Sequence, residues 1–476
     1  MKFNSKQFLK QPERLFLVVS LFFGIVSAFM LPVLTGPDEG AHFWVSYSMF
    51  TKNEQIPQDL LISANQSVKD VSSGRYINDL FEDSANLQGD DFALNYSKDV
   101  YINSTNDSRK TGIHDLAHIP QAIGILLGRL IHPSVGVMVV FGRLFNLAVY
   151  IGAIYIIIKR IKYGRLALAF VALFPMMIQQ ASTLSYDVMN TVAIFAWVAF
   201  VINLSLQRVR LSRKQVVVLG LLAILLIATK RSNVLLLGLL PFLPPSLYFN
   251  QVTTQKMQQW KSALLRHKRV VVSSLLAVAV LATIAFLYLL DHYLAGRGVS
   301  SVRFFEVLFN TFFRPEVNTQ LDPIITSGVV GNFAWLWYRL PAWIVFLQLS
   351  VFGLILLGDK TPVISKKFAV ASGIIFIGSV LGITVGMYFA WTLLPSVAGP
   401  LATFIQGMQG RYFTPLLILL IPAFAYLQKH ISVKIAPELL HKIAWSTAIF
   451  SLTIYVILTW IFFYTPADGV KDILLK

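Results

Sequence analysis

Uncharged apolar runs of about 20 residues recur along this chain of 476 residues, and Leu15–Leu34 is the first of them. As an α-helix, a run of this length matches the hydrocarbon thickness of a bilayer. Hydrophobic residues make up 56% of the chain and charged residues only 13%, too few to cover the surface of a soluble protein of this size. The pattern therefore predicts an all-α polytopic membrane protein.

The net charge is +17, and the distribution of the basic residues along the chain indicates the membrane topology. Six short basic clusters, one in every second loop, hold 23 of the 40 Lys and Arg residues. Because basic residues mark cytoplasmic loops, we expect the N-terminus in the cytoplasm, the C-terminus outside and no nucleic-acid partner. No small-residue cleavage site precedes Pro37, so the first run is predicted to be a signal anchor.

Alternation from a cytoplasmic N-terminus predicts about 11 transmembrane helices in a single membrane domain over residues 1–476. The predicted spans are 15–34, 135–158, 166–186, 188–207, 215–229, 232–249, 271–294, 337–358, 368–390, 412–428 and 443–464. No internal repeat accompanies them, which weakens the reading as an inverted-repeat transporter. The absence of cysteine excludes disulfides, thiol catalysis and Cys-ligated zinc.

Two large regions are predicted on the outer side. The first, residues 35–134, begins with a loop (35–115) that holds 13 of the 23 acidic residues. It continues with a half-apolar helix from His114 to Arg129, which we expect to lie along the membrane surface. The second outer region comprises residues 295–336.

Two adjacent carboxylates, Asp38 and Glu39, stand directly after the first apolar run, in Gly36-Pro37-Asp38-Glu39-Gly40-Ala41-His42. Acids are not usual anchors for a span, so the pair is a candidate catalytic site on the outer side. One carboxylate would take a proton from an acceptor hydroxyl, while the other orients it or binds a divalent cation. The alternative is a helix start at Glu39, where an acid suits the N-terminal dipole.

Basic side chains form a second signal, because several of them lie near the outer membrane surface. Lys230 and Arg231 follow a short span, Arg143 lies within the second span, and Arg411 stands where the span 412–428 begins. Such charges bind a phosphate well, and a lipid phosphate is the natural candidate. Alternatively, they snorkel to lipid headgroups or pair with Asp187.

Further polar residues near these groups are candidates for substrate binding. They are His42, His114, His118, Asp187, Gln409 and Tyr412. In Gln409-Gly410-Arg411-Tyr412-Phe413-Thr414-Pro415, the glycine would permit close approach of a ligand, although the segment also suits a plain helix start. Taken alone, Asp187 suits a helix N-cap. The histidines match no strong metal-ligand spacing, so no metal site is predicted, and no nucleotide-binding motif supports nucleotide-driven transport.

Several motifs together resemble a bacterial membrane-protein family, domain of unknown function 2142, which belongs among the GT-C-type glycosyltransferases. The matching residues run through about 400 positions in order. They are Pro37-Asp38-Glu39 with His42, Gly142-Arg143-Leu144 with Asn146, Pro175 with Ser185 and Asp187, Lys230 with Asn233, Gly331-Asn332-Phe333-Ala334-Trp335 with Pro341, and Gln409-Gly410-Arg411-Tyr412-Phe413 with Pro415. Gly36 stands where the family leads us to expect proline, and Ala334 where it leads us to expect glycine.

The resemblance implies a GT-C fold in the bacterial cytoplasmic membrane, with an extracytoplasmic active site and a sugar donor linked to polyprenyl phosphate. Asp38 matches the family's carboxylate in the first outer loop. We therefore expect transfer to a cell-envelope glycan or lipid, with Asp38 as base and Glu39 as its helper. Arg411, Lys230, Arg231 and Arg143 would hold the donor phosphate.

Two other functions fit the composition. A transporter or lipid flippase would need polar residues deep within the spans, whereas most charges here gather at the outer ends. A non-catalytic scaffold for envelope assembly would leave the combination of Asp38 and Arg411 without a role.

Overall fold

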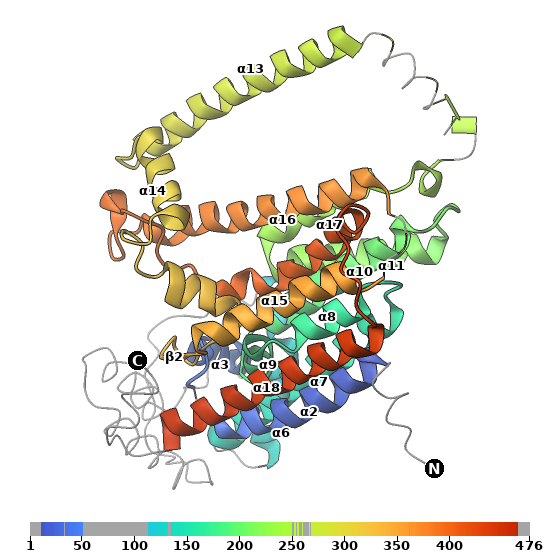
Figure 1. Ribbon diagram of the computed structural model, residues 1–476. Coiled ribbons are helices and arrows are strands. Elements are labelled where there is room, and N and C mark those ends of the chain that lie inside the picture. Colours follow the sequence, from blue (N-terminus) through green and yellow to red (C-terminus); the bar gives the residue numbers. More distant parts are fainter. Residues whose placement is uncertain are drawn as a thin grey trace.

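The computed structural model describes residues 11–32, 34–50, 113–131, 135–249, 268–360 and 364–464, with a few further positions at 252–253, 255–256, 259, 266 and 362. The chain is largely helical, and most of its long helices run side by side (Figure 1). Residues 51–112, the greater part of the predicted acidic loop, lie outside the described residues.

The first half of the chain is built from helices that begin at recognisable signals. Pro12 and Pro175 start α2 and α9, where the missing N–H of proline costs no hydrogen bond, and Ser212 forms a capping box before α11. The helices are α2 (Pro12–Met30), α3 (Glu39–Ser48), η2 (Ile113–His118), α6 (Ile119–Ile131), α7 (Val135–Arg160), α8 (Arg165–Ala172), α9 (Pro175–Ala181), α10 (Asp187–Ser205), α11 (Arg213–Thr229), η3 (Arg231–Phe242) and η4 (Pro245–Leu247).

The second half adds further helices and one short hairpin. Its elements are α13 (Lys268–Ala295), α14 (Ser301–Phe313), η5 (Leu321–Thr326), η6 (Ser327–Val329), β1 (Asn332–Phe333), β2 (Tyr338–Arg339), α15 (Ala342–Gly358), α16 (Lys366–Met387), η7 (Tyr388–Thr392), η8 (Gly399–Leu401), η9 (Gly410–Tyr412), η10 (Thr414–Leu419), α17 (Leu420–Leu427) and α18 (Pro437–Tyr464). The two strands are antiparallel, with Asn332 opposite Arg339 and Phe333 opposite Tyr338.

Each predicted span overlaps between one and three consecutive helical segments. The predicted span 166–186 divides into α8 and α9, because Pro175 cannot continue the hydrogen-bond pattern of α8. Among the described residues, six helices are long and apolar enough to cross a membrane. They are Pro12–Met30, Gly136–Arg160, Asp187–Ser205, Lys366–Thr392, Gly410–Leu427 and Pro437–Phe463. The molecule is thus a helical membrane protein.

The helix ends next to basic clusters lie on one side of the molecule. In Figure 1 the starts of α2 and α16 and the end of α15 lie on the right, whereas α3 and β2 lie on the left. This arrangement agrees with the alternation that the charge pattern predicts.

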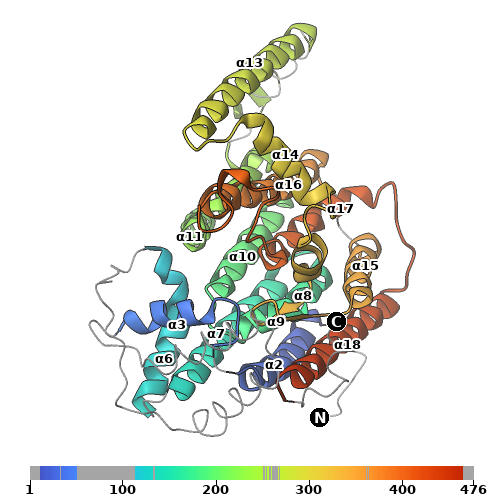
Figure 2. The same ribbon diagram turned by 90° about the vertical axis from the view of Figure 1, so that its left-hand side faces the viewer.

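The centre of the molecule is formed by α8, α9 and the start of α10. All residues from 166 to 185 are buried. Figure 2 shows these helices surrounded by α2, α7, α15 and α18. A central position explains why α8 is apolar on every face from Leu166 to Ala172, since a helix buried all round has no polar side.

The helix predicted between His114 and Arg129 is present as η2 and α6, but it packs along α7. A Cβ at Gly124 would lie 2.4 Å from the Phe141 carbonyl oxygen, and one at Gly128 would lie 3.0 Å from the Met138 Cα. Later residues of α6 thus contact earlier residues of α7, so the two helices are antiparallel and very close. Because α7 is a candidate span, α6 runs alongside a candidate span, while the expected position along the membrane surface stays a prediction.

Candidate functional site

The Asp38 carboxylate is held away from its own helix and faces Arg411. Asp38 is the N-cap residue of α3, with φ 59°, but its side chain accepts no capping hydrogen bond. Its Oδ2 lies 2.5 Å from the Arg411 Nη2, and the Asp38 side chain remains 48% exposed. An uncommon backbone conformation that turns a half-exposed acid toward a cation is typical of a functional position.

Arg411 is the centre of the site. It lies on η9, and its side chain is only 4% exposed. Its Nε is 3.8 Å from the Asp187 Oδ2, so the guanidinium stands between two carboxylates. Among the described residues, neither Nε nor Nη1 has a hydrogen-bond partner. A buried guanidinium with unused donors is well suited to bind an anion.

Lys230 adds a second positive charge beside Arg411. Its Nζ lies 4.6 Å from the centre of the Tyr412 ring, and the Arg411 Cζ lies 5.3 Å from the same ring. Burial lowers the pKa of Lys230, an effect opposed by Asp187 and reinforced by Arg411. Tyr412 therefore contacts both cations, and a π-face stabilises each of these neighbouring positive charges.

The position of Lys230 is fixed by asparagine contacts between neighbouring helices. The Asn233 N–H donates to the Lys230 carbonyl, and the Asn233 Nδ2 donates to the Asn190 Oδ1 at 2.7 Å. Asn190 lies on α10, three residues after Asp187. Arg231, also expected to bind phosphate, has an exposed side chain at the first position of η3, whereas Lys230 is half-buried.

Gly410 has a packing role in addition to its place beside Arg411. A Cβ at this position would lie 2.2 Å from both the Ile325 carbonyl oxygen and the Val329 nitrogen. The close approach that the sequence predicted is therefore made to the protein's own backbone, not to a ligand. Gln409 precedes it half-buried, and its Oε1 has no hydrogen-bond partner among the described residues.

Glu39 and Arg143 form a buried ion pair, which corrects their expected roles. Both side chains are 0% exposed, and the Arg143 Nη2 lies 2.7 Å from the Glu39 Oε2. Glu39 also accepts hydrogen bonds from the backbone nitrogens of Gly36 and Leu184. Arg143 donates further to three carbonyls at the end of α2, those of Ala28, Leu31 and Pro32.

Neither member of this pair is accessible to a substrate. Glu39 does not start a solvated helix or orient an acceptor, and Arg143 does not contact a donor phosphate. Instead, the pair ties the end of α2 to α7 and holds the backbone just before Asp38. It acts on the site only through the position of Asp38.

His42 and His118, both candidates for substrate binding from the sequence, lie side by side in the structure. The His42 Nδ1 lies 3.0 Å from the His118 Nε2, both residues are buried, and the Tyr186 ring packs against both imidazoles. Burial and the neighbouring His118 lower the pKa of His42 to about 3. The imidazole is therefore neutral at physiological pH. The His114 side chain lies outside the described residues.

The sequence context suggested that Asp187 is the N-cap of α10, but the structure shows that it is not. Tyr186 is the N-cap residue, and Asp187 is the first residue of the helix. Its carboxylate is available to Arg411 because it is not used for capping. Within the described part of the chain, no group of three or more His, Asp or Glu residues is placed to hold a metal ion.

Sequence reasoning missed Tyr186 and Trp335 as parts of this site. Tyr186 adjoins Asp187, so its position beside a lone acid was the available signal. The Trp335 Nε1 donates to the Leu34 carbonyl at 3.2 Å, which fixes the β1–β2 hairpin against the segment before Asp38. Ala334, where the family resemblance suggested glycine, has φ 53°.

Comparison with known families supports the grouping of these motifs. The profile described as "Predicted membrane protein (DUF2142)" matches residues 21–420. The chain belongs to this family. No curated protein and no solved structure matches the chain. The matched range includes Asp38, Asp187, Lys230 and Arg411.

Proposed function

We propose that this protein is an integral membrane glycosyltransferase of GT-C type, which moves a sugar from a polyprenyl-phosphate carrier to a cell-envelope glycan or lipid. The observation that carries the proposal is the ion pair of half-exposed Asp38 with deeply buried Arg411. A purely structural pair has no need of an acid in a left-handed conformation or of guanidinium donors without partners.

The donor phosphate would bind at Arg411 and Lys230. Arg411 offers Nη1 and Nε, and the Lys230 ammonium lies 4.6 Å from the centre of the Tyr412 ring that Arg411 also contacts. Together they would neutralise the charge that develops on the phosphate as it leaves the sugar. A lipid-linked leaving group explains how such an enzyme works without a nucleotide.

Asp38 would act as the base of the transfer step. It accepts the proton of the acceptor hydroxyl while the acceptor oxygen attacks the anomeric carbon of the sugar. The bond between that carbon and the phosphate oxygen breaks, and polyprenyl phosphate leaves with the bonding electrons, held by Arg411. Asp187 balances the charge of Arg411 and keeps its guanidinium in place between the two carboxylates.

The membrane arrangement follows from the charge pattern. We propose eleven spans in the bacterial cytoplasmic membrane, with the N-terminus in the cytoplasm and the site on the outer face. The acceptor would approach Asp38 between the first outer region and residues 295–336. Most of that first region, residues 51–112, lies outside the described part of the chain.

The site favours an enzyme over a transporter. A transport path needs polar groups along the depth of the membrane. The buried side chains of Glu39 and Arg143 form an ion pair with each other and therefore do not line such a path. The remaining charges, Asp38, Asp187 and Arg411, gather in one place beside the outer segments. A scaffold would have no use for the open donors of Arg411.

Donor binding provides the test. Binding of undecaprenyl phosphate to the purified protein in detergent would be measured for wild type, Arg411→Ala, Arg411→Lys and Lys230→Ala. Loss of a charge-assisted hydrogen bond should weaken binding by roughly ten- to a hundredfold. Arg411→Lys should also be impaired, since an ammonium cannot replace a planar guanidinium.

Arg339→Lys is the matched control, because Arg339 pairs with Asp322 at 3.3 Å on the exposed surface of the hairpin. Its affinity should equal that of wild type. Equal affinities in all variants would refute the phosphate site and leave these basic residues as headgroup anchors.

A further inference from the structure

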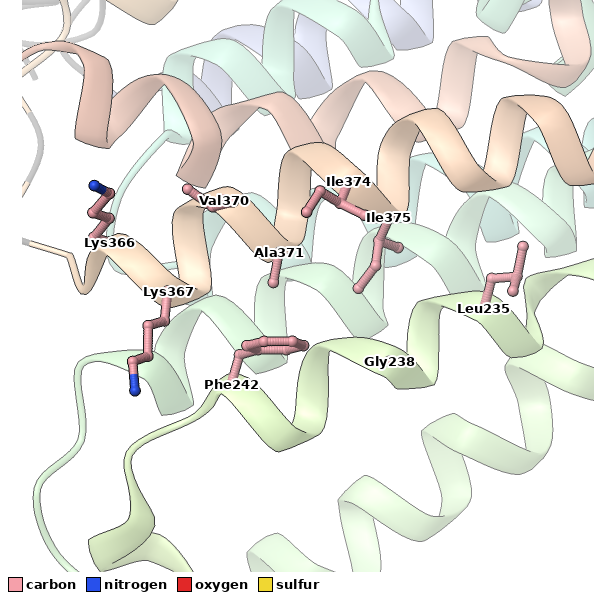
Figure 3. A pocket seen from close by; sticks show the side chains of 9 residues that line it. All are labelled: Leu235, Gly238, Phe242, Lys366, Lys367, Val370, Ala371, Ile374 and Ile375. Carbon is pink, nitrogen blue, oxygen red and sulfur yellow. The ribbon is translucent and has the colours of Figure 1, made fainter. Parts of the chain in front are cut away.

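A lipid-sized cavity lies between η3 and α16. Its volume is about 580 Å³, within the range of about 300–1,000 Å³ that ligand pockets occupy. Leu235, Gly238 and Phe242 line it from η3, and Ile375 is among the residues that line it from α16. Figure 3 shows apolar side chains along its length and Lys366 and Lys367 at one end.

The cavity opens sideways, toward the lipid that surrounds a membrane protein. Ile374 is 63% exposed, Val370 46% and Leu235 44%, although all three line the cavity. Apolar side chains that are both cavity walls and exposed surface on a candidate span face hydrocarbon. A lipid chain can therefore enter from the bilayer without any opening of the helices.

The length of the groove corresponds to one leaflet. On α16 it extends from Lys366 to Ile375, nine steps along the helix, which is about 14 Å. Half of a hydrocarbon core of about 30 Å is about 15 Å. A chain in this groove would begin at the headgroup level beside the lysines and end near the middle of the bilayer.

The charged end of the groove is suited to an anionic headgroup. Lys366 and Lys367 are exposed and begin α16, where the helix dipole adds positive potential. Ser365 caps the helix through the Phe368 nitrogen, so the first turn is ordered. Basic groups beside an apolar groove at the cytoplasmic ends of helices are typical of sites for anionic lipid headgroups.

We propose that this groove is a specific site for an anionic glycerophospholipid of the cytoplasmic leaflet. The phosphate lies at the charged end of the groove, near Lys366 and Lys367, and one acyl chain lies against Gly238 and Phe242. The charged end of the groove is distinct from the donor site, because Phe242 lies twelve residues, about 24 Å, from Lys230 at the rise of a 3₁₀-helix, although the apolar end begins at Leu235, about 10 Å from Lys230. The inference therefore does not depend on the glycosyltransferase proposal.

The test measures binding of phosphatidylglycerol and phosphatidylcholine to the purified protein in a non-ionic detergent by native mass spectrometry. Lys366→Gln/Lys367→Gln removes the charged end. Because each lysine near an anionic headgroup contributes about fivefold in affinity, the double variant should bind phosphatidylglycerol roughly 25-fold more weakly. Lys434→Gln/Lys442→Gln, which removes two exposed lysines elsewhere on the same side, is the matched control.

A second pair of variants tests the apolar wall. A Cβ at Gly238 would lie 3.4 Å from the Ile375 Cδ1, an ordinary contact, so Gly238→Ala should fold and bind normally. Gly238→Leu would fill the groove and should lose phosphatidylglycerol. If Gly238→Leu does not fold, the lysine variants alone decide the outcome.

The expected result is a preference for phosphatidylglycerol that Lys366→Gln/Lys367→Gln abolishes and the control retains. Equal binding of the two lipids would overturn the proposal. So would an equal loss in both lysine double variants, since that result reports only the general charge of the surface. Unchanged lipid binding by a folded Gly238→Leu variant would overturn it as well.

Discussion

Replacement of Glu39 by glutamine should destabilise the protein strongly, although Glu39 adjoins the proposed catalytic residue. Its two carboxylate oxygens accept from Arg143 and from the backbone nitrogens of Gly36 and Leu184. Glutamine would turn an NH₂ group toward some of these donors and would leave the buried Arg143 without a counter-charge. Breaking a buried ion pair in this way costs about 3–5 kcal/mol.

Asp38→Asn is the matched comparison, because it changes the neighbouring acid in the same manner. Asp38 is 48% exposed, and the buried Arg411 keeps Asp187 as a counter-charge, so loss of the Asp38 charge should cost only about 1 kcal/mol. Asparagine also tolerates φ 59° as well as aspartate does. The fold should therefore survive this substitution almost unchanged.

The assay is thermal unfolding of both variants in one detergent, followed by intrinsic fluorescence and by the yield of monodisperse protein. Glu39→Gln should unfold at a clearly lower temperature than wild type, and Asp38→Asn within about a degree or two of it. The reasoning is refuted if Glu39→Gln unfolds like wild type and yet loses activity. That outcome would give Glu39 a chemical role in place of the structural one.

Three further predictions follow. His42, with a pKa lowered to about 3, binds fewer protons when folded than when unfolded, so stability should decline as pH falls from about 6.5 toward 3; His42→Gln should flatten this dependence in pH-resolved unfolding. Ala334→Gly should raise the unfolding temperature slightly, because Ala334 has φ 53° and glycine relieves a left-handed cost of about 1–2 kcal/mol, partly offset by chain entropy. A reporter fused after Lys476 should report the outer compartment and one within 250–270 the cytoplasm; the same side for both would make the eleven-span count wrong by an odd number.

Hydrophobic patterning predicted most of the helices, because a membrane leaves a chain few other ways to satisfy its backbone. The apolar run at 135–158 became α7 (Val135–Arg160) with almost the same limits. The patterning could not resolve the break at Pro175 or the 3₁₀ geometry of η3, since both depend on packing against neighbouring helices. The antiparallel packing of α6 along α7 was missed for the same reason.

The sequence analysis selected residues that lie together in the structure, but it did not distinguish the roles of these residues. Asp38, Asp187, Lys230 and Arg411 were all selected, and the structure brings them together around one guanidinium. It could not separate Asp38 from Glu39, because adjacent carboxylates look alike in a sequence. A left-handed residue at Asp38 turns one acid toward Arg411 and leaves the other buried in the core.

Arg143 shows the same limit in another form. From the sequence it was one more basic group near the outer surface, equivalent to Arg411. In three dimensions its donors are used by Glu39 and by the carbonyls that end α2. Which arginine stays open to a ligand depends on contacts between segments about a hundred residues apart, and no local pattern records them.

Sugar transfer by purified protein in proteoliposomes, with a polyprenyl-phosphate-linked sugar as donor, tests the central claim most directly. Wild type and Arg339→Lys, which alters an exposed base paired with Asp322, should transfer equally well. Asp38→Asn should bind the donor and retain the wild-type unfolding temperature, but its transfer rate should fall by at least about a hundredfold, as expected for loss of a general base. Transfer by Asp38→Asn at the wild-type rate would contradict the account.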